Sequence, residues 1–366
     1  MKKSLSEKLM ILVFLIFIGG FSVANLLAEK KTFSENENRT LAPMPSLTLQ
    51  SITGGKFDDE FETWFSDHFI ARDSWIELKA YLKKATGSLE NNDVYYADDG
   101  RLIRTFSTWR EESLQQNIDT VNAFLNDNDL HAAIMIVPTA SYGQRNALPA
   151  NAEADQPALL DRIEGAFAGQ TFVRVDDRMN GSDDLYYHTD HHWNHNGARL
   201  GYEAIASQVL HKKPEDFTYT TVSDSFYGTM YSRSGAFWVS PDTIVRMDPA
   251  KPLNVEVTYD NGQVSSSLFV PERLSEKDQY TYYLDGNHAF LEIHTDAPGE
   301  RTALVIKDSF DHILLPYLAT EYSSLQVVDL RYYHSPLAEM AAAADDIYFI
   351  YSLDNFCEDP NLIFLR

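Results

Sequence analysis

The densest set of reactive side chains lies in one short segment, His188-Thr189-Asp190-His191-His192-Trp193-Asn194-His195. Four of the eleven histidines of the chain fall within it. Two chemistries fit this pattern. In one, Asp190 orients and polarises His192, which acts as a general base. In the other, several imidazoles and Asp190 bind zinc or a similar ion. A hydrogen-bonded loop without reactivity is the third interpretation.

A possible nucleophile elsewhere in the chain separates these interpretations. Residues 302–306 form an apolar run that predicts a buried strand, and residues 310–319 predict a helix, so Ser309 stands at the elbow between them. A serine at such an elbow is exposed at the carboxyl end of a sheet, beside N–H groups that can stabilise an oxyanion. Asp308-Ser309 alone is also a common helix cap. Together with Asp190 and His192, Ser309 completes a Ser-His-Asp triad, and this favours the triad over the metal site.

These motifs resemble those of a known family. The segment Thr189-Asp190-His191-His192-Trp193 is similar to the signature of the DHHW family and to the T-D-x-H-W pattern of periplasmic alginate O-acetyltransferases. The domain of those enzymes resembles SGNH hydrolases with the serine block moved after the Asp/His block, and the order is the same here. Further similar segments are Phe33-Ser34-Glu35, Glu37-Asn38-Arg39, Leu41-Ala42-Pro43, Asp67-His68-Phe69, Arg72-Asp73, Val137-Pro138, Leu148-Pro149 and residues 328–333.

The resemblance implies an activity and a role for each triad residue. It implies that Ser309 takes up an acetyl group and passes it on, with His192 as base and Asp190 orienting the imidazole. We expect no metal and no other cofactor. Lys307 departs from the pattern, because a glycine is common two residues before the nucleophile of SGNH enzymes.

Four further residues are candidates for substrate binding. Asn287 could supply a second oxyanion donor, as an asparagine does in SGNH enzymes, although it also reads as an ordinary turn residue. Arg331 and Tyr332 follow a predicted core strand and could line the site. Trp193 could stack on a sugar ring, although core packing is the commoner fate of tryptophan.

The elements that would position these residues alternate between strand and helix. Buried strands are predicted within residues 132–137, 171–175, 302–306, 325–330 and 347–351, and amphipathic helices within 114–125 and 200–210. This alternation predicts an α/β sandwich around a mostly parallel sheet. Combined with the resemblance, the expected fold is an SGNH-hydrolase-like three-layer sandwich with a circularly permuted motif order.

The domain boundaries follow from changes in this pattern. Residues 93–366 are predicted to form the catalytic domain, and residues 212–300, rich in Tyr, Thr, Ser and Val, to form an antiparallel β insertion. Residues 29–92 are predicted to form an extended stalk followed by helices.

The first 28 residues carry a targeting signal. Lys2, Lys3 and Lys8 precede a mostly apolar run from Leu9 to Leu27, which predicts a transmembrane signal anchor with the body of the protein outside the cytoplasm. Residues 22–24 could instead be a cleavage site that would release a secreted protein.

The composition narrows the classes of function. A formal net charge of −24 argues against nucleic acid as a partner, because phosphate binding needs a basic surface. The single cysteine, Cys357, excludes an intramolecular disulfide.

We therefore expect an extracytoplasmic enzyme that acts on acyl esters, most simply an O-acetyltransferase for a cell-surface polysaccharide. Its acetyl donor would be a membrane-bound O-acyltransferase, because acyl-CoA is not available outside the membrane. Three alternatives stay open: a carbohydrate esterase on the same fold, a non-catalytic glycan-binding or assembly protein, and a metal-dependent hydrolase.

Overall fold

The computed structural model describes residues 4–28, 30–34, 36–37, 39–149, 155–182 and 184–366. The chain divides into two compact units. The first consists of Met1–Ser88 with the short segment Gly235–Phe237, and the second of Leu89–Ser234 with Trp238–Arg366.

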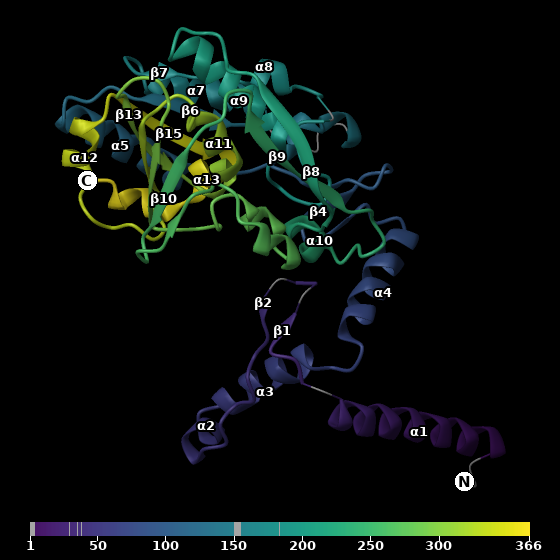
Figure 1. The fold of residues 1–366 in the computed structure, drawn as a ribbon. Coiled ribbons are helices and arrows are strands. Elements are labelled where there is room, and N and C mark those ends of the chain that lie inside the picture. Colours follow the sequence, from purple (N-terminus) through teal and green to yellow (C-terminus); the bar gives the residue numbers. More distant parts are fainter. Residues whose placement is uncertain (1–3, 29, 35, 38, 150–154, 183) are drawn as a thin grey trace. The chain divides into compact units, whose positions relative to one another are not determined.

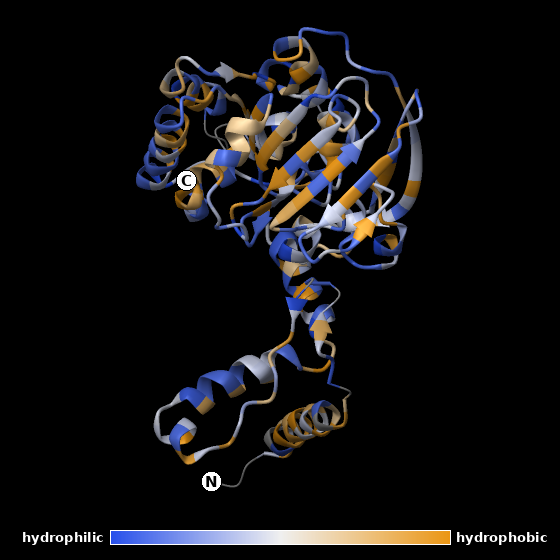
Figure 2. Cartoon of the chain, turned by 60° about the vertical axis from the view of Figure 1, so that its left-hand side comes forward, coloured by the Kyte–Doolittle hydropathy of each residue, from blue (hydrophilic) through white to orange (hydrophobic). Residues whose placement is uncertain are grey.

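The first unit is helical. Its elements are α1 (Leu5–Leu27), β1 (Phe33–Ser34), β2 (Arg39–Thr40), α2 (Leu49–Thr53), α3 (Lys56–Asp67) and α4 (Arg72–Ala85). Helix α1 is apolar along most of its length (Figure 2). The segment Lys8–Asn25 within it is, by length and composition, the one candidate membrane span in the part of the chain that the structure describes. It fits an anchor or a signal sequence.

An ion-pair network joins residues of the expected stalk to the helices α3 and α4 that follow it. Both oxygens of the Asp67 carboxylate accept hydrogen bonds from the guanidinium of Arg39, and Oδ2 also accepts one from Ala42 N–H at 2.8 Å. Arg72 donates to both oxygens of Glu37, at 2.6 and 3.0 Å. Several of the motif residues shared with the resembling family therefore meet in the first unit.

The second unit is built on an eight-stranded mixed sheet in the order β11-β10-β12-β14-β13-β15-β6-β7 (Figure 1). Its strands are β6 (Ala133–Val137), β7 (Thr171–Phe172), β10 (Val255–Tyr259), β11 (Val264–Ser265), β12 (Phe290–Thr295), β13 (Thr302–Lys307), β14 (Ser324–Val328) and β15 (Asp346–Ser352). The five strands from β14 to β7 run parallel, as the alternation of strands and helices predicts.

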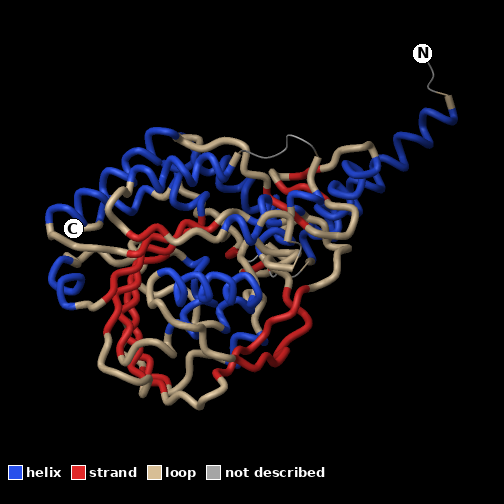
Figure 3. The backbone as a smooth tube through the Cα atoms, turned by 90° about the horizontal axis from the view of Figure 1, so that it is seen from above, coloured by secondary structure: helices blue, strands red, loops and turns tan. Residues whose placement is uncertain are grey.

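Both faces of this sheet are covered. Along β6, Ala133, Met135 and Val137 belong to one apolar core, and Ile134 and Ile136 belong to the other. A strand buried on both faces needs such an unbroken apolar sequence. Figure 3 shows helices on both sides of the sheet, so the expected three-layer sandwich is confirmed.

Short strands and helices complete the second unit. The remaining strands are β3 (Glu90–Asn91), β4 (Val94–Tyr96), β5 (Leu102–Arg104), β8 (Phe217–Phe226) and β9 (Asp242–Pro249). The α-helices are α5 (Glu111–Asp127), α6 (Ala140–Gly143), α7 (Gln156–Ala166), α8 (Asp176–Met179), α9 (His195–Gln208), α10 (Thr229–Ser234), α11 (Leu315–Leu318), α12 (Ala338–Ala343) and α13 (Leu353–Glu358). The 3₁₀ helices are η1 (Arg145–Ala147), η2 (Pro271–Ser275), η3 (Gln279–Tyr282), η4 (Ser309–Leu314) and η5 (Pro360–Phe364).

The predicted β insertion is antiparallel, but it is not separate from the main sheet. Strands β8 and β9 form a two-stranded ribbon of their own, whereas β10, β11 and β12 extend the central sheet through antiparallel pairing of β12 with β14. The sheet is therefore mixed at one edge. Strand pairing over such distances in sequence is not visible in the hydrophobic pattern.

The prediction of one helix at residues 310–319, directly after Ser309, was wrong in detail. Residues 310–319 do not form one helix: the 3₁₀ helix η4 is followed by the four-residue helix α11. Pro316 lacks the N–H that a continuous α-helix would need at this point.

Candidate functional site

The polar residues of interest gather where the parallel strands end. Thr139 follows β6, Ser309 follows β13, Asp329 follows β14 and Asp354 follows β15. The carboxyl ends of parallel strands lie at one edge of a sheet, where open α/β folds bind ligands. The loop that carries Asp190 and His192 enters at the same edge.

That loop is held by its own backbone and by the start of α9. Tyr186 and Trp193 pair as an isolated antiparallel bridge, and Asn194 caps α9 by accepting hydrogen bonds from the N–H groups of Asn196 and Gly197. Gly197 has to be small, because a Cβ there would lie 2.4 Å from the Leu185 carbonyl oxygen. The loop therefore packs directly against the helix.

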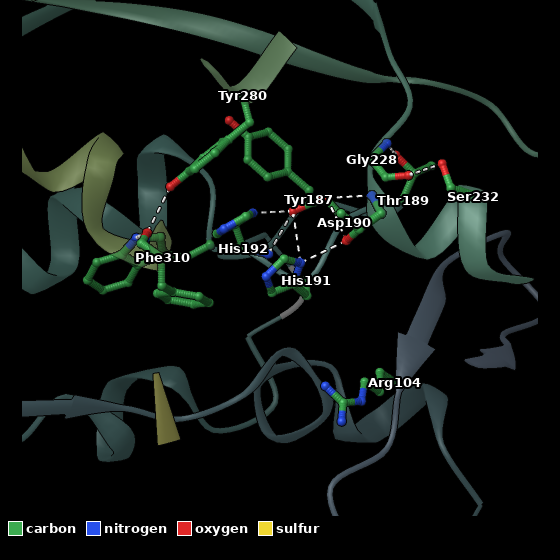
Figure 4. Close-up of polar contacts among 12 residues, drawn as sticks. Arg104, Tyr187, Thr189, Asp190, His191, His192, Gly228, Ser232, Tyr280 and Phe310 are labelled. Carbon is green, nitrogen blue, oxygen red and sulfur yellow. Dashed lines mark hydrogen bonds and ion pairs between the residues drawn. The ribbon is translucent and has the colours of Figure 1, made fainter. Parts of the chain in front are cut away.

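Asp190 is buried, and both of its oxygens accept hydrogen bonds. Oδ1 accepts one from His192 N–H at 3.0 Å and one from His192 Nδ1 (Figure 4). Oδ2 accepts from Thr229 N–H at 2.6 Å and from Thr229 Oγ1 at 2.9 Å. Burial opposes ionisation, but the two adjacent imidazoles and these hydrogen bonds outweigh it and hold the pKa of Asp190 well below its ordinary value. An ionised Asp190 fixes His192 as the tautomer protonated at Nδ1.

Thr229 reaches Asp190 because the residue before it is glycine. A Cβ on Gly228 would lie 2.3 Å from Asp190 Cβ and Oδ2. The loop is held from the other side by Asp242, which accepts hydrogen bonds from the N–H groups of His188 and Thr189 at 2.8 and 2.7 Å. Our sequence reasoning missed Gly228, Thr229 and Asp242, since nothing in their local sequence marks them.

The imidazole of His192 is enclosed by aromatic rings. It stacks on Tyr280 with ring centroids 3.9 Å apart, and the ring of Phe310 lies 5.6 Å away. Its Nε2 is buried and has no hydrogen-bond partner among the described residues. A buried imidazole nitrogen without a partner is costly, and this is the atom that a general base uses.

The carbonyl group of Phe310 ties the two halves of the site together. It accepts hydrogen bonds from Trp193 Nε1 at 3.0 Å and from the hydroxyl of Tyr280 at 2.8 Å. Ser309, the residue before Phe310, is partly exposed and is the first residue of η4. The segment of the expected nucleophile thus lies beside the Asp190–His192 pair. The hydrogen bond from Ser309 to His192 is not formed, so the third link of the triad stays a prediction.

Asp308 fixes the position of the elbow. Its Oδ1 accepts a hydrogen bond from Phe310 N–H at 2.9 Å. Its Oδ2 accepts from Ser352 N–H at 3.1 Å, Ser352 Oγ at 3.0 Å and Asn355 Nδ2 at 2.7 Å. The backbone at Ser309 is therefore tied to the end of the neighbouring strand β15.

A group of buried polar side chains lies around this elbow. Lys307, which replaces the expected glycine, is 2% exposed, and burial lowers its pKa to about 8 against the opposing effect of Asp329 and Asp311. The carboxyl group of Asp311 and the ring nitrogens of His312 have no hydrogen-bond partner among the described residues. Burial, and then the charge of Asp308, raises the pKa of Asp311 well above its ordinary value.

The structure corrects one of the predicted substrate-binding residues. Trp193 is 0% exposed and donates its indole N–H to Phe310, so its ring is not open to a sugar. Asn287 is exposed, and its Oδ1 accepts a hydrogen bond from Arg331 at 3.0 Å. Arg331 also pairs with Asp329, and its guanidinium lies over the ring of the exposed Tyr332. Roles for these three residues stay predictions.

The four histidines of residues 188–195 do not all gather at one point. His195 packs against the ring of Tyr219, and His188 is exposed. Among the described residues, Asp190, His191 and His192 form the one group whose donor atoms could hold a metal ion, since these atoms lie within 4.8 Å of one another. The Nδ1 of His191 hydrogen-bonds to Thr229 Oγ1 at 2.8 Å, and burial, followed by the charge of His192, lowers its pKa to about 4. The hydrogen bonds already made by both imidazoles and Asp190 fit a hydrogen-bonded site more directly than a metal site.

The domain and the fold are similar to those of known proteins. Residues 95–275 match the family model described as the SGNH hydrolase-like domain of acetyltransferase AlgX. No curated protein matches the chain in sequence. The fold is similar to that of a DHHW family protein from Eubacterium siraeum, with 18% identity, a TM-score of 0.64, and coverage of 75% of this chain and 95% of that chain.

Two other solved structures are similar. PatB1 of Bacillus cereus with a sulfonyl adduct has 20% identity and a TM-score of 0.63, over 75% of this chain and 98% of that chain. The O-acetyltransferase domain of Pseudomonas putida AlgJ has 15% identity and a TM-score of 0.45, over 74% of this chain and 96% of that chain. The match to the family model and the likeness to the DHHW family protein confirm the resemblance expected from the motifs.

Proposed function

Since residues 95–275 carry an SGNH hydrolase-like domain of the acetyltransferase AlgX type, we propose that this chain is an O-acetyltransferase with the triad Ser309, His192 and Asp190. The observation that carries the proposal is the buried Asp190–His192 pair, because His192 Nε2 has no hydrogen-bond partner among the described residues and the His192 ring lies 5.6 Å from the ring of Phe310, the residue after Ser309. A base oriented by a carboxylate beside a serine at an elbow is the arrangement that activates a hydroxyl group.

The reaction has two halves. His192 Nε2 removes the proton of the Ser309 hydroxyl while Oγ bonds to the acyl carbon, and the donor's leaving group departs with that proton. The resulting acyl-serine is attacked by a sugar hydroxyl, which gives its proton to His192. Ser309 is then released and takes the proton back. Asp190 stays ionised and stabilises the imidazolium in both halves.

We further propose that the catalytic unit lies outside the cytoplasm, held by α1. A cell-surface polysaccharide would be the acceptor. A membrane-bound O-acyltransferase would supply acetyl groups from the cytoplasmic side, because an external enzyme has no acyl-CoA.

The test uses the full chain purified in detergent, with 4-nitrophenyl acetate as donor. We expect acetyl release that Ser309→Ala reduces by about 10³-fold or more. A sulfonyl fluoride should modify Ser309, as judged by peptide mass spectrometry. Ser323→Ala is the matched control, because Ser323 is also partly exposed and lies at the opposite edge of the sheet.

The outcomes separate the alternatives. Equal turnover by Ser309→Ala and the unaltered chain would exclude Ser309 as the nucleophile. Release to water alone, with every glycan acceptor refused, would favour the esterase. Binding of a glycan without any turnover would favour a binding protein. Stoichiometric zinc that is lost together with activity on chelation would favour the metal-dependent hydrolase.

A further inference from the structure

A small hollow lies beside the Asp190–His191 pair. Its volume is about 20 Å³, which is enough for about one water molecule and therefore for a hydroxyl group rather than a whole sugar ring. Its lining includes Asp190, His191, Phe310, Arg104 and Asp354. The hollow thus touches both the histidine loop and the residue that follows Ser309.

One charged pair faces this hollow and has no role in the proposed acyl transfer. Arg104, at the end of β5, lies 3.5 Å from Asp354 (Nη1 to Oδ2) in the first turn of α13. The two side chains are 39% and 18% exposed. In Figure 4, Arg104 stands apart from the hydrogen-bonded group around Asp190.

The pair has unused hydrogen-bonding capacity. The contact is at the long limit of a hydrogen bond, and neither side chain makes another hydrogen bond to the described residues. A guanidinium offers five N–H donors, and a carboxylate offers about four acceptor positions. Arg104 and Asp354 therefore present a donor and an acceptor side by side.

The charge around the hollow selects against an anion. Arg104 is the one cationic side chain among the described lining residues, whereas Asp190 and Asp354 are both carboxylates. A carboxylate or phosphate on a ligand would meet two like charges at short range, which is costly where water is partly excluded. The apolar lining of Leu102, Phe106 and Met230 suits the C–H edge of a sugar ring.

Resting on the proposed function, we infer that this hollow and the Arg104–Asp354 pair that lines it form the acceptor subsite for a neutral sugar. Two adjacent hydroxyl groups of the sugar bind the pair, and the hollow has room for one of them. One hydroxyl accepts a hydrogen bond from Arg104, and the next donates one to Asp354. The ring is thereby held at the mouth of the hollow, next to His191 and Phe310. Arg104 and Asp354 are specificity residues in this scheme and take no part in proton transfer.

The experiment measures how acetyl groups divide between sugar and water. The full chain is given 4-nitrophenyl acetate with neutral oligosaccharides of glucose, galactose, mannose or N-acetylglucosamine, or with oligogalacturonate of equal length. Acetylated sugar is counted by mass spectrometry, and total release by absorbance. We expect transfer to at least one neutral acceptor and about 10-fold less, or none, to oligogalacturonate.

Variants connect this preference to the pair. Arg104→Ala and Asp354→Asn should each lower the ratio of transfer to hydrolysis by up to about 10-fold, because the first removes a charged donor and the second replaces a charged acceptor by a weaker neutral one. Arg104→Lys should recover part of the ratio. Arg246→Ala is the control, because Arg246 is paired with Asp248 on β9, outside the hollow. Circular dichroism checks that each variant is folded. If Arg104→Ala is not folded, Asp354→Asn alone tests the role of the pair.

Two results would overturn the inference: an unchanged ratio in Arg104→Ala and Asp354→Asn, or acetylation of oligogalacturonate in preference to the neutral acceptors. Failure of the proposed function looks different: Ser309→Ala would then release acetate as fast as the unaltered chain, or every acceptor, neutral and charged, would be refused.

Discussion

The indole N–H of Trp193 donates a hydrogen bond of 3.0 Å to the carbonyl oxygen of Phe310, across 117 positions of sequence. Trp193 directly follows His192, and Phe310 directly follows Ser309. One bond between two fully enclosed residues therefore sets the spacing of the two segments on which the proposed acyl transfer depends. Tyr280 donates to the same carbonyl oxygen and also stacks on His192, so it reinforces this spacing.

Trp193→Phe tests this relationship. The substitution keeps an aromatic ring but removes the donor, leaving the Phe310 carbonyl with Tyr280 alone. We expect a loss of about 1–2 kcal/mol in the free energy of unfolding. We also expect a fall in kcat for acetyl release with little change in KM, because the catalytic geometry rather than binding is altered. Denaturant unfolding and steady-state kinetics measure both, and Tyr280→Phe should act in the same direction. An unchanged kcat in both variants would show that the bond is structural only.

Asp308→Asn tests the elbow. The carboxylate accepts four hydrogen bonds, and an amide has one oxygen to accept them, so Ser352 or Asn355 loses its partner. We expect kcat for acetyl release to fall by about 10-fold or more while circular dichroism stays unchanged. Labelling of Ser309 by a sulfonyl fluoride should slow in parallel, which a purely structural role would not require. Ser352→Ala, which removes one of the four bonds, should have a smaller effect.

Local sequence was sufficient for most of the framework. The unbroken apolar runs identified β6, β13 and β15, because strands buried on both faces cannot alternate with polar residues. The stripe of Leu114 and Ile118 identified α5 in the same way. Asp190 and His192 also form the expected hydrogen bond. A bond between residues two positions apart depends only on the local conformation of their own loop, so the motif is enough to predict it.

The rest of the site depends on contacts between distant segments. Thr229 completes the bonding of Asp190 from 39 positions away, and Tyr280 covers His192 from the β insertion. Neither residue has a distinctive local sequence. The burial of Trp193 could not be foreseen either, because the same residue type serves in cores and on sugar-binding surfaces.

The ion pairs of the first unit give a prediction about acid stability. The Asp67 side chain is 5% exposed, and its hydrogen bonds with Arg39 lower its pKa to about 2 against the opposing effect of burial. A carboxyl group with a depressed pKa stabilises the fold above its unfolded pKa of about 3.9, and this contribution is lost as the pH falls toward 2. Asp67→Asn should therefore cost about 1–3 kcal/mol at pH 7. Urea unfolding at pH 7 and pH 3 should show a smaller difference at pH 3; an equal difference would contradict the prediction.

Asp190→Asn separates the orienting role of Asp190 from its charge. An amide can still contact His192, but its N–H₂ group can favour the tautomer in which Nδ1 is unprotonated, and Nε2 is then no longer a base. We expect kcat for acetyl release to fall by about 10³–10⁴-fold, as loss of an orienting aspartate does in other triads.

Because the pKa of Asp190 is held below its ordinary value, the ionised form stabilises the fold above pH about 4 and this contribution is lost as the pH falls further. The difference in unfolding free energy between the unaltered chain and Asp190→Asn should thus be largest near neutral pH and shrink in acid. Thr229→Val, which removes one hydroxyl donor to Asp190, is the matched control and should lower kcat far less. If Asp190→Asn keeps near-normal turnover, His192 does not depend on Asp190 and the triad assignment fails.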